Sequence, residues 1–129
     1  NHVNAVVDFY GPTDLNAFYD CPITDGKALT IEQKTRVFGN VENISKKFEL
    51  ANPINYIDKN TPPFLIIHGE KDKVVPVCQS KLLHEALLKS NIESELILKE
   101  DGDHNGNTFM PYQTNLMANF FYNQYNKQL

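Results

Sequence analysis

The chain has 129 residues, 41% of them hydrophobic and 22% charged, and a formal net charge of −4. These values are typical of a single globular domain with a core of its own. Because the charge is negative and no apolar run approaches the length of a membrane span, we expect binding to neither nucleic acid nor membrane.

The first predicted element is a strand over residues 3–9, which is more apolar than alternating and ends at Tyr10-Gly11-Pro12. Residues 13–61 are less regular, and we interpret them as a cap-like insertion over the edge of a sheet. Two helices are expected inside this insertion. One follows a capping box and covers 31–38, and the other covers 42–50.

A strand, a helix and a second strand follow in a βαβ pattern. Residues 64–67 form a short, wholly apolar run that suits a strand buried on both faces. A helix over 77–90 and a strand over 93–99 complete the unit, whose crossover should be right-handed. A last helix is expected to begin at Pro111, with an apolar face made by Tyr112, Leu116, Met117, Phe120 and Phe121. The sequence therefore predicts an α/β domain with three parallel strands flanked by helices.

Two residues with catalytic chemistry follow the strands of this unit. Asp72 lies in the loop after the first strand, and His104 lies in the loop after the second. Because the carboxyl ends of parallel strands meet at one edge of a sheet, these side chains should meet there. A carboxylate that accepts from an imidazole N–H fixes the tautomer of the ring and stabilises the imidazolium. Glu70, in the same loop as Asp72, competes for the role of the acid.

Several stretches together resemble the C-terminal part of an α/β-hydrolase. They are Val3 to Leu15, Pro62 to Pro76, Gln79-Ser80 and Gly102-Asp-His-Asn-Gly106. The pattern is similar to the esterase/lipase branch that includes acetyl- and feruloyl-esterase-like enzymes, and prolyl-oligopeptidase-type peptidases share it. By this resemblance Asp72 matches the triad acid, in preference to Glu70, and His104 matches the triad base. The family usually has Gly-x-Gly-His at the base, whereas this chain has Asp101-Gly-Asp-His104.

The resemblance places the nucleophile of the family in a Gly-x-Ser-x-Gly elbow before residue 3. The serines of this chain stand at 45, 80, 90 and 94, and none has a glycine two residues away on either side. The segment that supplies the oxyanion-hole donors is missing too. The resemblance therefore implies the C-terminal part (1–129) of a serine esterase for small-molecule esters, without a cofactor, and inactive as this chain alone. Two alternatives are a peptidase fragment of the prolyl-oligopeptidase type and a non-catalytic binding module with hydrolase architecture.

Two patterns point to other chemistry. Asp101 to Gly106 matches the first half of a calcium loop, but the twelfth position is Tyr112 where a bidentate Glu is needed, so no metal site is expected. Cys21 and Cys78 are too few and too far apart for a metal knuckle or a disulfide framework, so we expect two free thiols. As a nucleophile Cys78 would follow the acid instead of preceding it, and a small buried residue is the preferred interpretation.

The first predicted strand has an exposed edge. In the α/β-hydrolase family the sheet continues before residue 3, so the strand over 3–9 would lie between two neighbours. Here one side lacks a predicted partner, and the unpaired N–H and C=O groups of an apolar edge favour pairing with another chain. We therefore expect a homodimer through this strand. The sequence does not decide between a cytoplasmic and a secreted protein.

Overall fold

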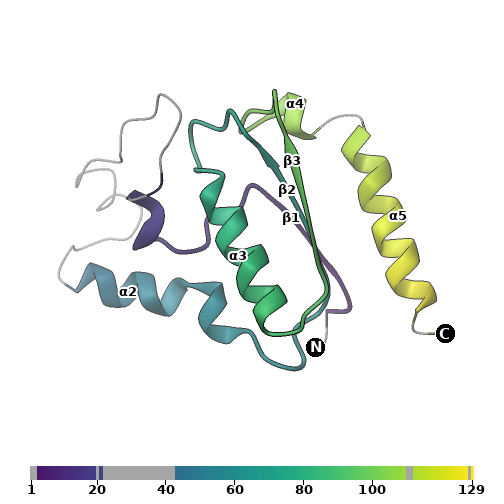
Figure 1. Cartoon of the computed structure of the whole chain (residues 1–129), viewed down its shortest axis with the longest axis horizontal. Coiled ribbons are helices and arrows are strands. Elements are labelled where there is room, and N and C mark those ends of the chain that lie inside the picture. Colours follow the sequence, from purple (N-terminus) through teal and green to yellow (C-terminus); the bar gives the residue numbers. More distant parts are fainter. Residues whose placement is uncertain (1–2, 20, 22–42, 110–111, 128) are drawn as a thin grey trace.

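Three parallel strands organise the chain (Figure 1), whose computed structural model describes residues 3–19, 21, 43–109, 112–127 and 129. The elements in chain order are β1 (Val6–Phe9), the 3-10 helix η1 (Ala17–Tyr19), α2 (Ile44–Ala51), the 3-10 helix η2 (Pro53–Tyr56), β2 (Phe64–Gly69), α3 (Cys78–Lys89), β3 (Ser94–Lys99), α4 (Gly106–Phe109) and α5 (Tyr112–Asn126). The helix expected over 31–38 lies outside the described residues. The cap-like insertion over 13–61 stays a prediction.

The sheet has the strand order β1-β2-β3, and both pairs of neighbours are parallel. This confirms the predicted α/β architecture, with α3 as the crossover between β2 and β3. β1 begins at Val6 instead of residue 3, because its partner on β2 is Phe64 and a proline precedes Phe64. Pro63 accepts a hydrogen bond from the Val6 amide but has no N–H with which to extend the ladder.

β2 is the central strand and continues two residues beyond the predicted end. His68 pairs with Leu98 and Gly69 pairs with Lys99, so the prediction that the strand ends at Ile67 was wrong. The apolar run that precedes His68 is buried as expected of a strand between two layers, since its last three residues are at most 1% exposed. The longer strand carries the His68 side chain into the interior.

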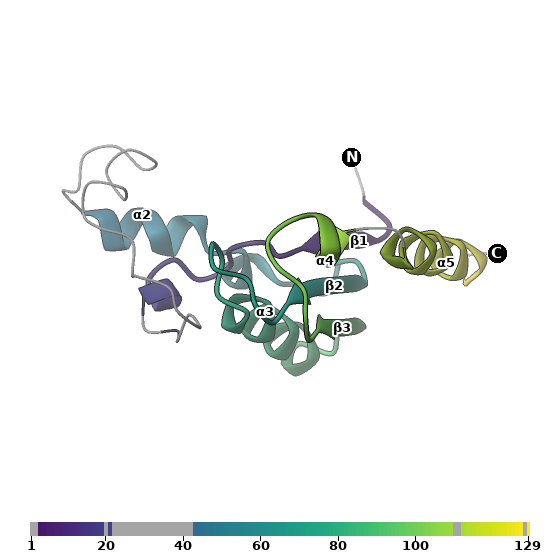
Figure 2. The same cartoon turned by 90° about the horizontal axis from the view of Figure 1, so that it is seen from above.

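Helices cover both faces of the sheet, with α3 on one side and α5 on the other (Figure 2). The buried clusters are Ile66, Leu83 and Leu87 on the α3 face and Leu65, Ile67 and Phe120 on the α5 face. Alternate residues of β2 thus serve opposite layers. The apolar face of α5 is narrower than predicted, because Phe121 is 42% exposed while its neighbour Phe120 is buried.

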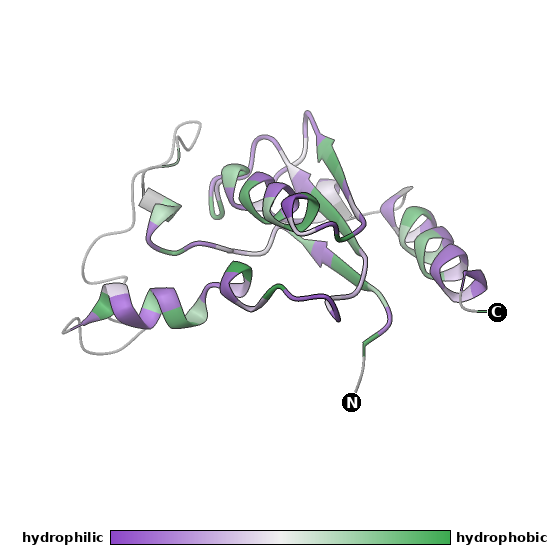
Figure 3. Cartoon of the chain, turned by 60° about the horizontal axis from the view of Figure 1, so that its bottom comes forward, coloured by the Kyte–Doolittle hydropathy of each residue, from purple (hydrophilic) through white to green (hydrophobic). Residues whose placement is uncertain are grey.

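α2 lies inside the segment 13–61 and leads toward β2. It runs from Ile44 to Ala51, close to the expected 42–50, and buries Phe48. The Asn52 side chain then accepts from the Ile54 amide and begins η2. In Figure 3 the helices carry both hydrophobic and hydrophilic residues, as helices with one packed face do. No helix among the described residues is long and apolar enough to cross a membrane.

β1 forms one edge of the sheet within the described part of the chain, because the strand order gives it β2 as its neighbour. Its four residues are all half-buried. The Val6 amide is already used in pairing with β2. By the alternation of parallel strands, the Val7 amide points away from β2. The homodimer through this edge stays a prediction.

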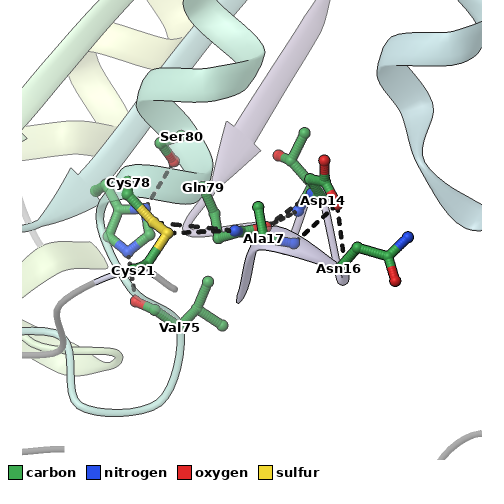
Figure 4. Close-up of a disulfide and its surroundings, with 10 residues drawn as sticks. Asp14, Asn16, Ala17, Cys21, Val75, Cys78, Gln79 and Ser80 are labelled. Carbon is green, nitrogen blue, oxygen red and sulfur yellow. Dashed lines mark hydrogen bonds between the residues drawn. A yellow bond between two sulfur atoms is a disulfide. The ribbon is translucent and has the colours of Figure 1, made fainter. Parts of the chain in front are cut away.

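A disulfide joins Cys21 to Cys78, so the expectation of two free thiols was wrong (Figure 4). Cys78 is the first residue of α3, and Cys21 follows η1. The prediction rested on the long separation of the two cysteines in sequence. In the fold, the chain that leaves β1 returns over the start of α3 and brings them together. The Gln79 side-chain oxygen fixes this return by accepting from the Thr13 and Asp14 amides at 2.8 and 2.7 Å.

The disulfide should contribute strongly to stability. It closes a loop across 57 residues of sequence, and the chain-entropy account of such a loop gives about 4 kcal/mol. We expect that Cys21→Ser combined with Cys78→Ser lowers the free energy of unfolding by about 2–4 kcal/mol in a urea titration. Reducing agent should lower the stability of the wild type and leave the double variant unchanged. Two titratable thiols in the oxidised, unfolded wild type would contradict the bond.

Candidate active site

The loops that follow β2 and β3 lie against each other. A Cβ atom added to Gly69 would lie 2.3 Å from the carbonyl carbon of Gly102, and one added to Gly102 would lie 2.8 Å from the Gly69 Cα. Both positions therefore need glycine, because a side chain at either would force the backbones apart. The Lys71 amide donates to the Gly102 carbonyl at 2.9 Å and ties the loops together.

Asp72 and His104 meet at this edge of the sheet, as the parallel strands predicted. The Nδ1 atom of His104 lies 2.8 Å from Oδ2 of Asp72. The other carboxylate oxygen, Oδ1, accepts from the Val74 and Val75 amides at 2.8 and 2.9 Å. Asp72 is 2% exposed, whereas the competing Glu70 is exposed to solvent. The geometry brings together Asp72 and His104 and leaves Glu70 outside the pair.

His104 has the geometry of a general base. Because Asp72 accepts at Nδ1, the ring proton lies on Nδ1 and the lone pair lies on Nε2. Nε2 has no hydrogen-bond partner within the described residues, and the side chain is 28% exposed. A cavity of about 410 Å³ lies beside the ring, lined among others by Lys71, Lys73, Val74 and Asn105.

Tyr10 is a site residue that sequence reasoning missed. Its ring lies against the His104 imidazole, with 4.5 Å between the ring centroids and a tilt of 49°. Its backbone has the unusual φ of 46°, and its amide donates to the Ile67 carbonyl at 2.9 Å. The sequence showed Tyr10 only as the end of a strand. Its place at the carboxyl end of a parallel strand was the signal that could have identified it.

His68 lies beneath the pair, at the end of β2, and is fully buried. Its Nδ1 lies 2.6 Å from the Ser80 hydroxyl, and its Nε2 lies 3.0 Å from the Val75 carbonyl oxygen and 3.2 Å from Asp72 Oδ2. Burial lowers the pKa of His68, although the Val75 carbonyl and the Asp72 and Asp8 carboxylates oppose this shift. His68 is therefore a neutral ring at physiological pH.

Asp8, near the end of β1, is a half-buried carboxyl group close to His68. Burial raises its pKa, while the hydrogen bond that Oδ1 accepts from the Gly11 amide at 3.1 Å and the nearby His68 oppose the shift. Burial thus favours the neutral form of the Asp8 carboxyl group.

None of the four serines makes a hydrogen bond with His104. The Ser80 and Ser94 hydroxyls are paired with His68 and His84, at 2.6 and 2.9 Å. Ser45 lies on α2 and Ser90 follows the far end of α3, and both are exposed. The Asp72–His104 pair thus has no serine hydroxyl bonded to it.

The loop that resembles a calcium site is closed by its own hydrogen bonds. The Asn107 side chain accepts from the Asp103 amide and donates to the Asp101 carbonyl, and the Asp103 carboxylate accepts from the Asn105 amide. Across the described residues, no group of three or more His, Cys, Asp or Glu side chains could hold a metal ion. The Asn107 side chain and the Asp103 carboxylate therefore shape the loop that carries His104.

The sequence of this chain is similar to those of known proteins. The family model BD-FAE matches residues 1–87. The esterase LipC of Mycobacterium tuberculosis is 34% identical over 87 residues, which cover 66% of this chain and 21% of LipC. The chain therefore spans about a fifth of the length of this curated relative.

Two solved structures match almost the whole chain. A bifunctional GH43-CE protein of Bacteroides eggerthii has a TM-score of 0.79 and 36% identity, over 95% of this chain and 16% of that one. A truncated carbohydrate esterase from gut microbiota has a TM-score of 0.79 and 33% identity, over 95% of this chain and 43% of that one. The strands, helices and loops described above thus form part of an α/β-hydrolase fold.

The buried His68 predicts how stability depends on pH. Its pKa in the folded chain lies below the ordinary value of 6.5, so the unfolded chain binds more protons below that pH. Its contribution to stability is complete above about pH 6.5 and is lost as the pH falls toward the folded pKa. One such group contributes at most about 1.4 kcal/mol per pH unit.

The measurement is a series of urea titrations between about pH 7.5 and 5.5 on the wild type and on His68→Gln. The wild type should lose stability more steeply than the variant as the pH falls. Asp8 acts in the opposite sense, since a raised pKa gives stability that is lost as the pH rises. Both proteins contain Asp8, so the difference in slope reports the loss of His68 together with its effect on the pKa of Asp8. Equal slopes would show that His68 does not titrate abnormally.

Proposed function

Because the chain belongs to the BD-FAE family and has an α/β-hydrolase fold, we propose that it carries the acid and base of a serine esterase whose nucleophile is not among these 129 residues. Relatives named as esterases support ester hydrolysis as the reaction class. The observation that carries the proposal is the hydrogen bond from His104 Nδ1 to Asp72 Oδ2, with Nε2 left open toward solvent.

The proposed mechanism follows from this arrangement. A serine hydroxyl attacks the ester carbonyl while His104 Nε2 takes its proton, and Asp72 stabilises the imidazolium that forms. His104 then gives the proton to the oxygen of the leaving alcohol, which departs and leaves an acyl-enzyme. Water, deprotonated by the same nitrogen, releases the acid and restores the serine.

The substrate we propose is an acyl ester of a small molecule, and a carbohydrate ester fits best. Two solved relatives above 30% identity support this choice, since one is named a carbohydrate esterase and the other carries the label CE. The alternative of a peptidase has weaker support, because a puromycin-hydrolysing peptidase of Mycobacterium tuberculosis and an acylaminoacyl peptidase of Pyrococcus horikoshii are only 23% and 20% identical to this chain. Lys71 and Lys73 beside the cavity would contact the polar part of such a substrate.

The test supplies the missing nucleophile in a chimera. This chain replaces the matching 43% of the truncated carbohydrate esterase, and hydrolysis of an aryl acetate is measured. Asp72→Asn should lower kcat/KM on the order of 10⁴-fold, because the ring loses the partner that fixes its tautomer. Glu70→Gln, the matched control in the same loop, should lower it less than about tenfold, since the exposed Glu70 is not part of the pair.

The isolated chain is the second control and should show no turnover above buffer, because an acid and a base without a nucleophile cannot form an acyl-enzyme. Turnover by the isolated chain that His104→Ala abolishes would contradict the missing nucleophile. A larger loss in Glu70→Gln than in Asp72→Asn would make Glu70 the acid.

A further inference from the structure

Two imidazole rings approach the same carboxylate oxygen. Oδ2 of Asp72 lies 2.8 Å from Nδ1 of His104 and 3.2 Å from Nε2 of His68. The rings come from different elements, since His68 ends β2 and His104 lies in the loop after β3. The mechanism described above uses only His104, so the role of the second ring is open.

The surroundings of His68 determine which of its nitrogens carries the proton. Nε2 faces two acceptors, the Val75 carbonyl oxygen and Asp72 Oδ2, so the proton lies on Nε2. Nδ1 is then an acceptor, and the Ser80 hydroxyl donates to it at 2.6 Å (Figure 4). Ser80 and His68 are both fully buried, so water does not compete for these bonds.

His68 acts on the acid from two directions. Its N–H lies close to Oδ2 directly, and it also holds the carbonyl of Val75, whose amide donates to Oδ1 at 2.9 Å. Both carboxylate oxygens of Asp72 are therefore placed by contacts that involve His68. A carboxylate free to rotate would present either oxygen to His104 and would hold the ring less firmly.

We propose that His68, held by Ser80, is a positioning residue that orients the Asp72 carboxylate and so keeps His104 in its Nδ1–H tautomer. This inference rests on the proposed function for its catalytic meaning. The effect on the ring, however, exists in the isolated chain and is measurable without turnover. Ser80 itself makes no contact with the acid and acts through His68.

Two substitutions separate the two ends of the His68 ring. In His68→Gln the side-chain amide reaches the place of Nε2 and keeps a donor toward Val75 and Asp72. In His68→Asn the amide reaches only the place of Nδ1, so the bond to Ser80 is kept and the donor toward the acid is lost. Both variants remove a buried ring, and they differ in which end of the ring they replace, since His68→Gln keeps the donor toward the acid and His68→Asn keeps the contact with Ser80.

The experiment is ¹⁵N NMR of the imidazole nitrogens in the 129-residue chain near neutral pH. In the wild type we expect His68 as the Nε2–H tautomer and His104 as the Nδ1–H tautomer. In His68→Asn the ratio of Nδ1–H to Nε2–H tautomers of His104 should fall about tenfold, and in His68→Gln it should stay within about twofold of the wild type. In the chimera, His68→Asn should lower kcat at an unchanged KM, and His68→Gln should restore it.

Two results would overturn the proposal. If the wild-type His68 carries its proton on Nδ1, it is not a donor to the acid, and this result needs no variant to be folded. If His68→Asn and His68→Gln leave the His104 tautomers equally unchanged, the ring is a packing residue only. An inactive chimera with the expected NMR result would refute the esterase proposal and leave the positioning role intact.

Discussion

The buried carboxylate of Asp72 is the constraint on which the site depends. A carboxylate that is 2% exposed is unfavourable unless donors replace the water that it has lost. Two backbone amides of its own loop serve one oxygen, and two imidazole rings approach the other. Because these donors come from β2, the loop after β2 and the loop after β3, satisfying one charge fixes three segments relative to one another.

The close approach of Gly69 and Gly102 makes this arrangement possible. With any side chain at either glycine, the two loops would separate and His104 would move away from Asp72. The Thr108 hydroxyl lies against both glycines and donates to the Asp103 carbonyl, next to His104 in the chain. α4, a helix of one turn, is thus part of the support of the base.

The first turn of α3 connects the site to the segment after β1. Three consecutive residues each bind a different part of the chain. Cys78 forms the disulfide, Gln79 accepts from the Thr13 and Asp14 amides, and Ser80 holds His68. The path of the chain after β1 and the orientation of the Asp72 carboxylate therefore both depend on the first turn of α3.

Local patterns in the sequence determined the class of fold and identified one pair of residues in the candidate site. The apolar run at 64–67 indicated a strand buried on both faces. Parallel strands place their carboxyl ends, and the loops that follow them, at one edge of the sheet. These two facts were enough to bring Asp72 and His104 together across 32 residues. The apolar patterns of 77–90 and 93–99 also placed α3 and β3 to within one residue at each end.

Only the tertiary structure decided the contacts that depend on how the chain returns to the sheet. Cys21 and Cys78 are 57 residues apart, and nothing local to either one shows that the segment after β1 passes over α3. Tyr10 and His68 resemble an ordinary strand end and an ordinary buried histidine until the neighbouring loops surround them. The periodicity of a sequence reports which face of an element is buried, but the partner across that face is set by packing in three dimensions.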